Sequence, residues 1–246
     1  MNTLYITGAG VSAESGIPTF RGEDGFWTIG SRNYTPMEMA TRRMYAHNPA
    51  EFLAWYYHRF AIYRDYGPNE VHYWLADKNL ITQNIDGLDG KAGNKNYIAI
   101  HGRLDQMTLF HEQGPVAERL PTPWNDIIQQ HADSKAALKS ALFELFRIDP
   151  HSERPVLNHS YKPFVLLFDE FYTDLYRISE AQERMRAADK IVFMGTSFSV
   201  NITQMALDTA MHLNIPIEVV DPNPVLLPYK NVVYHQMKAL EYIQQR

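Results

Sequence analysis

Two neighbouring segments of the sequence end in side chains that could carry out acid–base chemistry on a bound ligand. The apolar run 80–82 is followed by the polar residues Gln83, Asn84 and Asp86, and the run 97–100 is followed by His101. Ligands of open α/β sheets bind at the carboxyl ends of the strands, so these side chains are expected at one edge. Histidine titrates near neutral pH, which makes His101 a candidate general base, with a structural role as the alternative.

A glycine-rich turn near the start of the chain predicts phosphate binding. Residues 8–13 read GAGVSA after an apolar run, which matches the G-x-G-x-x-A spacing of dinucleotide-binding turns. Backbone N–H groups at such a turn can bind a pyrophosphate, and an ordinary strand-to-helix turn is the alternative. A dehydrogenase would add a second strand ending in an acidic residue about 20 positions later. Residues 15–27 are instead rich in Gly and Pro, so hydride transfer is the least favoured function.

The elements that must position these residues are short apolar runs alternating with helical segments. The expected buried parallel strands are Leu4–Thr7, Leu80–Thr82, Tyr97–Ile100, Val165–Phe168, Ile191–Met194 and Ile217–Val220. The expected helices are Met37–Ala46, Pro49–Tyr66 with Asn48 as N-cap, Ser134–Phe146, Arg177–Ala188 and Asn201–Leu213. This alternation predicts an α/β fold with a Rossmann-like, doubly wound parallel sheet.

Composition narrows the function classes further. The 246 residues contain no cysteine, which excludes disulfides, thiol catalysis and cysteine-ligated zinc. A net charge of -5 gives no electrostatic argument for nucleic acid binding. No signal peptide and no membrane-spanning run is recognisable, so we expect a cytoplasmic protein that binds neither nucleic acid nor membrane. Oligomeric state is not predictable from the sequence.

Four motifs in a fixed order resemble the sirtuin family of NAD-dependent protein deacylases. They are GAGVSAESGIPTFRG at 8–22, TQNIDGL at 82–88, His-Gly at 101–102 and GTS at 195–197. The resemblance implies a cofactor site for NAD formed by Gly8, Ala9, Gly10, Glu14, Phe20, Arg21, Gln83, Asn84, Asp86, Gly195, Thr196, Ser197 and Asp221. It also implies His101 as the catalytic base, with Asn84 and Asp86 beside the nicotinamide and its ribose.

The same resemblance implies one catalytic domain over 1–246. Its Rossmann-like core would comprise 1–30, 68–112 and 161–246, and a smaller subdomain would comprise 31–67 and 113–160. The segment Tyr161–Glu170 is similar to the strand that binds acyl-lysine in the family, with Leu166, Phe168 and Asp169 in contact with an acylated lysine of a protein or peptide. The implied products are free lysine, nicotinamide and O-acyl-ADP-ribose.

Two residues bear on which acyl group is removed. Tyr56 and Arg59 share one face of the expected helix, and their Y-x-x-R spacing resembles the pair that recognises succinyl and malonyl carboxylates in one sirtuin class. Desuccinylase or demalonylase activity is therefore expected beside deacetylase activity. The alternative is an aromatic-rich core helix with one exposed arginine.

The chain also departs from the family. The zinc module's four cysteines are missing, and His111, His131, His151 and His159 show no paired metal-ligand spacing, so no metal is expected and a partly helical subdomain should replace the module. Asp169 stands where the family has Gly, and Asp89 where it usually has His.

Three other functions compete with deacylation. An NAD glycohydrolase or ADP-ribosyltransferase would use the same NAD pocket with another acceptor, which the cysteine-free insert and Asp169 favour. A non-catalytic NAD sensor would not need His101, Asn84 and Asp86, and a dehydrogenase would form NADH. The retained acyl-lysine segment favours deacylation.

Overall fold

The computed structural model describes residues 1–18, 34–112, 114, 118–131 and 134–246. Phe20 and Arg21, which the sequence places in the NAD site, lie outside the described residues. The chain forms two compact units. Unit 1 comprises Met1–Thr19, Tyr66–Ile100 and Tyr176–Arg246, and unit 2 comprises Phe20–Asp65 and His101–Leu175. The functional division into a core and an inserted subdomain stays a prediction.

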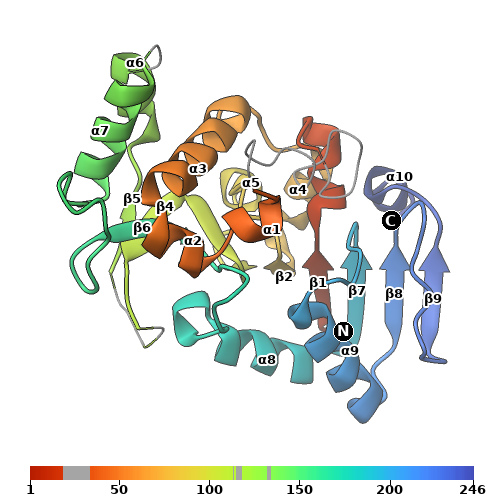
Figure 1. The fold of residues 1–246 in the computed structure, drawn as a ribbon. Helices are drawn as coiled ribbons and strands as arrows, with labels where there is room; N and C mark the ends of the chain where they lie inside the picture. Colours follow the sequence, from red (N-terminus) through yellow and green to blue (C-terminus); the bar gives the residue numbers. More distant parts are fainter. Residues whose placement is uncertain (19–33, 113, 115–117, 132–133) are drawn as a thin grey trace. The chain divides into compact units, whose positions relative to one another are not determined.

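Unit 1 is built on a six-stranded parallel sheet. Its strands are β1 (Thr3–Thr7), β2 (Asn79–Thr82), β3 (Ile98–Ala99), β7 (Lys190–Met194), β8 (Ile217–Val220) and β9 (Val232–His235). Their order is β3-β2-β1-β7-β8-β9, so the sheet is wound outwards in both directions from β1 and β7 (Figure 1). The expected Rossmann-like, doubly wound sheet is therefore confirmed. Only β9, a partly exposed edge strand, has no counterpart among the expected strands of this sheet.

Helices pack on the sheet of unit 1. They are α4 (Glu70–Trp74), α5 (Leu88–Lys91), α8 (Ile178–Arg186), α9 (Asn201–Leu213) and α10 (Ala239–Ile243). Helices α8 and α9 pack together, as do α4 and α10. Val71 of α4 and Tyr242 of α10 share a core cluster with Leu80, Val192 and Val220 of the sheet. Helix α9 has the bounds expected from the sequence, because its apolar residues recur at helical spacing.

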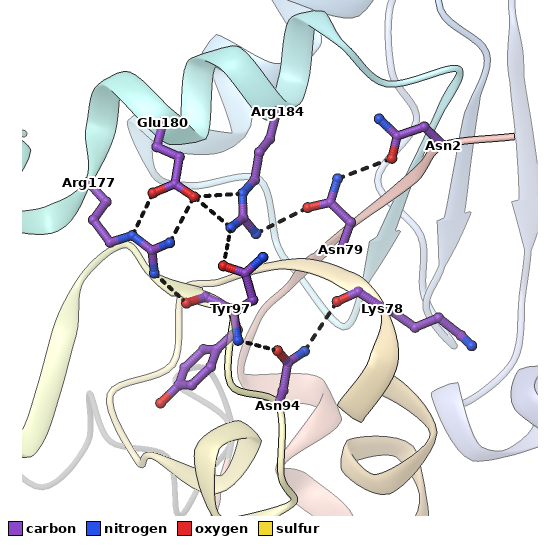
Figure 2. Close-up of polar contacts among 9 residues, drawn as sticks. Asn2, Lys78, Asn79, Asn94, Tyr97, Arg177, Glu180 and Arg184 are labelled. Carbon is purple, nitrogen blue, oxygen red and sulfur yellow. Dashed lines mark hydrogen bonds and ion pairs between the residues drawn. The ribbon is translucent and has the colours of Figure 1, made fainter.

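A polar network joins α8 to the beginnings of β1 and β2 (Figure 2). Arg184 donates to the Oδ1 atom of Asn79 at 3.1 Å, and Asn79 donates to the Oδ1 atom of Asn2 at 3.3 Å. Glu180 accepts from Arg184 and from Arg177, whose guanidinium also binds the Tyr97 carbonyl. A shallow groove of about 760 Å³ lies here. It lies where the strands begin, whereas open parallel sheets bind ligands where the strands end.

Unit 2 contains a three-stranded antiparallel sheet that the sequence did not predict. Its strands are β4 (Gly102–Leu109), β5 (Arg119–Pro121) and β6 (Tyr161–Val165), in the order β5-β4-β6. The expected parallel strand Val165–Phe168 is therefore wrong, because the paired strand ends at Val165 and runs antiparallel to β4. Phe168 is 49% exposed, so the apolar run there does not mark a buried strand.

Five helices are described in unit 2. They are α1 (Pro36–Met39), α2 (Arg42–His47), α3 (Pro49–Tyr63), α6 (Trp124–His131) and α7 (Lys135–Leu145). The side chain of Asn48 caps α3, as expected, and the side chain of Ser134 caps α7. The prediction of one helix over Met37–Ala46 is wrong. The first helix, α1, ends at Met39, and the side chain of Thr41 caps a second helix, α2.

The region that lacks the family's cysteines is organised around Trp124 of α6. This side chain is fully buried, and its Nε1–H group donates to the carbonyl of Leu104 at 2.8 Å. Its ring lies 5.7 Å from Phe60 of α3 and 5.5 Å from Phe146 beyond α7, measured between ring centroids. Aromatic packing thus joins α6 and α7 to α3 within unit 2.

Candidate functional site

In unit 1 the glycines of the first motif lie where two loops cross between β1 and β7. Gly8 N–H donates to the Met194 carbonyl at 3.0 Å, and Gly10 N–H donates to the Gly195 carbonyl at 2.9 Å. A Cβ atom on Gly10 would lie 2.6 Å from the Gly195 Cα atom, so the backbones approach too closely for a side chain. This crossing is the point where the strand order reverses, which is where doubly wound sheets bind their ligands.

A polar cluster formed by Ser12, Asn84 and Asp86 lies next to this crossing. The Ser12 hydroxyl donates to Asp86 Oδ2 at 2.7 Å and accepts from Asn84 Nδ2 at 3.1 Å. Asn84 Nδ2 also donates to the Gly8 carbonyl, at 3.0 Å. Asn84 is 5% exposed, and its Oδ1 atom has no hydrogen-bond partner among the described residues. A buried acceptor left open in this way is suited to a donor from a ligand.

His72 of α4 completes the cluster. Its Nδ1 atom accepts from the Asn69 backbone N–H at 3.3 Å, which places the ring proton on Nε2, 3.4 Å from the Ser12 hydroxyl. Burial lowers the pKa of His72, and the charge of Asp86 opposes this shift. The Nε2–H group therefore donates to the Ser12 hydroxyl oxygen, so that the hydroxyl proton points to Asp86.

The remaining expected cofactor residues of unit 1 lie at the same ends of the strands. Gln83 and Thr196 are buried and hydrogen-bonded to each other at 3.1 Å, joining the ends of β2 and β7. Asp221 follows β8, and its Oδ1 atom accepts from the Asn223 backbone N–H. The others lie at the surface or partly exposed: Ala9, Glu14 and Ser197.

Asp89 departs from the family and is buried in α5. It is 1% exposed, and its Oδ1 atom has no hydrogen-bond partner within the described part of the chain. Burial raises the pKa of Asp89 to about 7, and the nearby charge of Asp86 adds to the shift. This buried carboxyl group lies three residues after Asp86 of the polar cluster.

In unit 2, His101 is held by its backbone as well as by its ring. Its carbonyl accepts from the Leu166 N–H at 2.9 Å. The next residue must be glycine, because Gly102 has a φ of +83° and a Cβ atom would lie 2.0 Å from the Phe164 carbonyl oxygen. The Nε2 atom of His101 lies 2.8 Å from the Tyr172 hydroxyl. No sequence motif singles out Tyr172.

The expected acyl-lysine segment Tyr161–Glu170 begins as strand β6 and ends in a turn, residues 166–170, whose side chains bind α2. Asp169 accepts from the backbone N–H groups of Arg42 and Arg43, so its carboxylate caps α2. Glu170 is 3% exposed and accepts from the fully buried Lys162 at 3.1 Å. The Phe168 N–H donates to the Ala40 carbonyl at 3.0 Å. These contacts fix the segment; the substrate contacts expected for Leu166, Phe168 and Asp169 stay a prediction.

Tyr56 and Arg59 are both buried in α3, at 2% and 6% exposure. The Arg59 guanidinium lies 3.4 Å from the centroid of the Trp55 ring, and Nη1 donates to the Trp55 carbonyl. Burial lowers the pKa of Arg59 to about 10 and raises that of the Tyr56 hydroxyl. Arg59 is therefore not the exposed arginine of the alternative interpretation, and it stays charged at neutral pH.

No group of three or more potential metal ligands is found among the residues that the structure describes. His111 is 4% exposed, and neither of its ring nitrogens has a hydrogen-bond partner there. Burial and the charge of Lys162 lower the pKa of His111.

No described helix is long and apolar enough to cross a membrane.

The sheet order and the glycine crossing define a doubly wound α/β fold with a ligand site at its switch point. The Sir2 family model matches residues 8–202. NAD-dependent protein deacylase 1 of Caldanaerobacter subterraneus is 32% identical over 98% of this chain and 90% of the relative. NAD-dependent protein deacylase sirtuin-5, mitochondrial, of Xenopus tropicalis is 30% identical over 86% of this chain and 70% of the relative. The chain therefore belongs to the Sir2 family, which confirms the resemblance found in its motifs.

Solved structures of Sir2 homologues have a similar fold. A Sir2 homologue in complex with NAD is 27% identical with a TM-score of 0.71, covering 99% of this chain and 87% of that one. A mutant Sir2 homologue in complex with ADP-ribose is 26% identical with a TM-score of 0.73, covering 99% of this chain and 89% of that one.

Three residues of the observed clusters were not predicted as site residues: Ser12, His72 and Tyr172. Ser12 could have been predicted from the sequence, since it lies within the first motif.

Proposed function

We propose that this protein is an NAD-dependent lysine deacylase. The observation that carries the proposal is the cluster of Ser12, Asn84 and Asp86 at the switch point of the sheet. Relatives at about 30% identity over most of the chain bear the name of NAD-dependent protein deacylases, which supports the same activity here. His101 supplies the base that such a reaction needs.

The residues of unit 1 fit NAD. The crossing of Gly8 and Gly10 with Gly195 lies at the switch point, which is where doubly wound sheets bind the pyrophosphate of a dinucleotide. The open Oδ1 atom of Asn84 suits a donor such as a ribose hydroxyl or a carboxamide N–H. When bound, NAD supplies the ribose carbon that accepts the acyl oxygen as nicotinamide leaves.

The chain's own residues account for the rest of the chemistry. The Asp86 carboxylate is held by Ser12 and by the Leu88 backbone N–H, and it would stabilise positive charge that develops on the ribose of bound NAD. His101 accepts a proton from a ribose hydroxyl, which becomes the nucleophile that takes over the acyl group. Water then completes deacylation, and the products are the free lysine, nicotinamide and an O-acyl-ADP-ribose.

Nicotinamide release, measured with and without an acylated peptide, tests this proposal. We expect release to depend on the peptide and to be matched by formation of free lysine. Release that ignores the peptide would replace deacylation by NAD glycohydrolysis. We expect His101→Ala to abolish deacylation, and an unchanged rate would refute the role of His101.

We further propose that carboxylated acyl groups, succinyl and malonyl, are among the substrates. A charged arginine with a tyrosine one helical turn away on the same face suits a carboxylate, because both groups donate to its oxygens. Burial strengthens such a contact, since the surrounding dielectric is low. The 6% exposure of Arg59 and the flanking Trp55 ring give it such an environment.

Arg59→Met tests this specificity. We expect kcat/KM for a succinyl peptide to fall by about 10- to 100-fold, as for loss of a charged hydrogen bond, with little change for an acetyl peptide. Arg64→Met is the matched control, because Arg64 follows the same helix and pairs with the exposed Asp65. Equal losses on both peptides would count against carboxylate recognition.

A further inference from the structure

The candidate base of unit 2 is in contact with a tyrosine that the motifs do not include. The Tyr172 hydroxyl lies 2.8 Å from His101 Nε2, and the two rings are stacked with centroids 5.9 Å apart and planes at 29°. Tyr172 is partly buried. The contact therefore combines a short hydrogen bond with stacking of the two rings. Together they restrict both the rotation and the tilt of the imidazole.

Both partners sit on backbone that is itself held in place. The His101 carbonyl accepts from the Leu166 N–H, so His101 and the segment before Tyr172 are joined directly. That segment is held two residues before Tyr172 by Glu170, which binds buried Lys162 and the Leu167 N–H at 3.1 Å each. The approach of Tyr172 to His101 thus follows from the fold of unit 2.

The hydrogen bond has a preferred direction. A phenol is a better donor than a neutral imidazole N–H, and an imidazole nitrogen is a better acceptor than a phenol oxygen. Tyr172 O–H therefore donates to Nε2, which leaves the imidazole proton on Nδ1. In this tautomer Nε2 carries a lone pair, as a base requires.

We propose that Tyr172 is a positioning residue for the base, which fixes the ring of His101 and keeps its Nε2 atom unprotonated. This inference rests on the proposed function. In turnover a substrate hydroxyl replaces the phenol as the donor to Nε2, its proton passes to Nε2, and the hydroxyl oxygen becomes the nucleophile. The imidazolium then releases the proton to solvent, so the proton transfer itself needs no further reactant.

Tyr172→Phe tests the proposal, because it removes the hydroxyl and keeps the ring. Nicotinamide leaves before the base acts, so exchange of labelled nicotinamide into NAD reports the step that does not require Tyr172. We expect the deacylation kcat to fall by about 3- to 10-fold, the value of one hydrogen bond, and the exchange rate to stay within about twofold. Loss of both rates in proportion, or an unchanged or faster deacylation, would overturn the proposal.

Tyr45→Phe is the matched control within unit 2. Its hydroxyl donates to the Tyr161 carbonyl in the core, and its removal deletes a buried hydrogen bond away from His101. We expect this variant to change deacylation and exchange in the same proportion. The ratio of the two rates then separates a role at the base from a loss of stability.

A spectroscopic measurement on the full chain does not depend on activity. The ¹⁵N shifts of the His101 imidazole report its tautomer, and the spectrum of His101→Asn assigns the signal among the 10 histidines. We expect the Nδ1–H tautomer in the wild type and a larger share of Nε2–H in Tyr172→Phe. An unchanged tautomer would refute the proposal. A wild type without peptide-dependent nicotinamide release would refute deacylation, while the tautomer would still decide the role of Tyr172.

Discussion

Replacing Gly195 by alanine tests the loop crossing that forms the switch-point site. Gly195 has a φ of +59°, and a Cβ atom would lie 2.7 Å from the Gly10 Cα atom and 2.8 Å from the Val11 nitrogen. The left-handed conformation costs an alanine about 1–2 kcal/mol. Forcing a methyl group against backbone that cannot rotate away adds about 1–3 kcal/mol. We therefore expect Gly195→Ala to lower the free energy of unfolding by about 2–5 kcal/mol.

Gly93→Ala separates the two contributions. Gly93 also has a positive φ, of +102°, but nothing lies within 4 Å of its added Cβ atom. We expect this variant to lose only the conformational part, about 1–2 kcal/mol. Urea denaturation followed by circular dichroism gives both values, and titration with NAD gives the dissociation constants. Equal losses in the two variants would refute the claim that close backbone contact, rather than conformation, requires glycine at this crossing.

Two further predictions concern the stability of each unit. Burial alone would raise the pKa of Glu218, but hydrogen bonds from Lys190 and Tyr242 outweigh it and lower the pKa to about 2. The ionised Glu218 therefore stabilises unit 1 above its unfolded pKa of 4.5, and this stabilisation is lost as the pH falls towards 2. We expect Glu218→Gln to flatten the decline in urea midpoint between pH 5 and pH 3, and an unchanged slope would contradict this. In unit 2, Trp124→Ala should cost about 3–5 kcal/mol through the cavity it leaves, and a melting temperature within 2 °C of wild type would contradict the central place of Trp124.

The sequence predicted the parts of the fold that local patterns encode. Short apolar runs identified five strands of the parallel sheet, and helical spacing gave α9 its bounds. Capping residues such as Asn48 fixed where helices begin. The motifs placed Asn84, Asp86 and His101 shortly after strands, and β2 and β3 do end just before these residues.

Local patterns failed where long-range pairing decides the structure. The segment 102–109 mixes polar and apolar residues, and it becomes a strand because it pairs with β6, more than 50 residues away. The run 165–168 is as apolar as a buried strand, yet Phe168 is about half exposed, because the chain turns there and the next residue, Asp169, binds α2.

The chemistry of the site shows the same division. The sequence by itself determined the family, the glycines at the crossing and the residue types that follow β2 and β3. Only the tertiary structure brought His72 to Ser12, and Tyr172 to His101, across separations of 60 and 71 residues. Hydrogen bonds of this kind depend on distances and angles between side chains, which the spacing of residues along a chain does not encode.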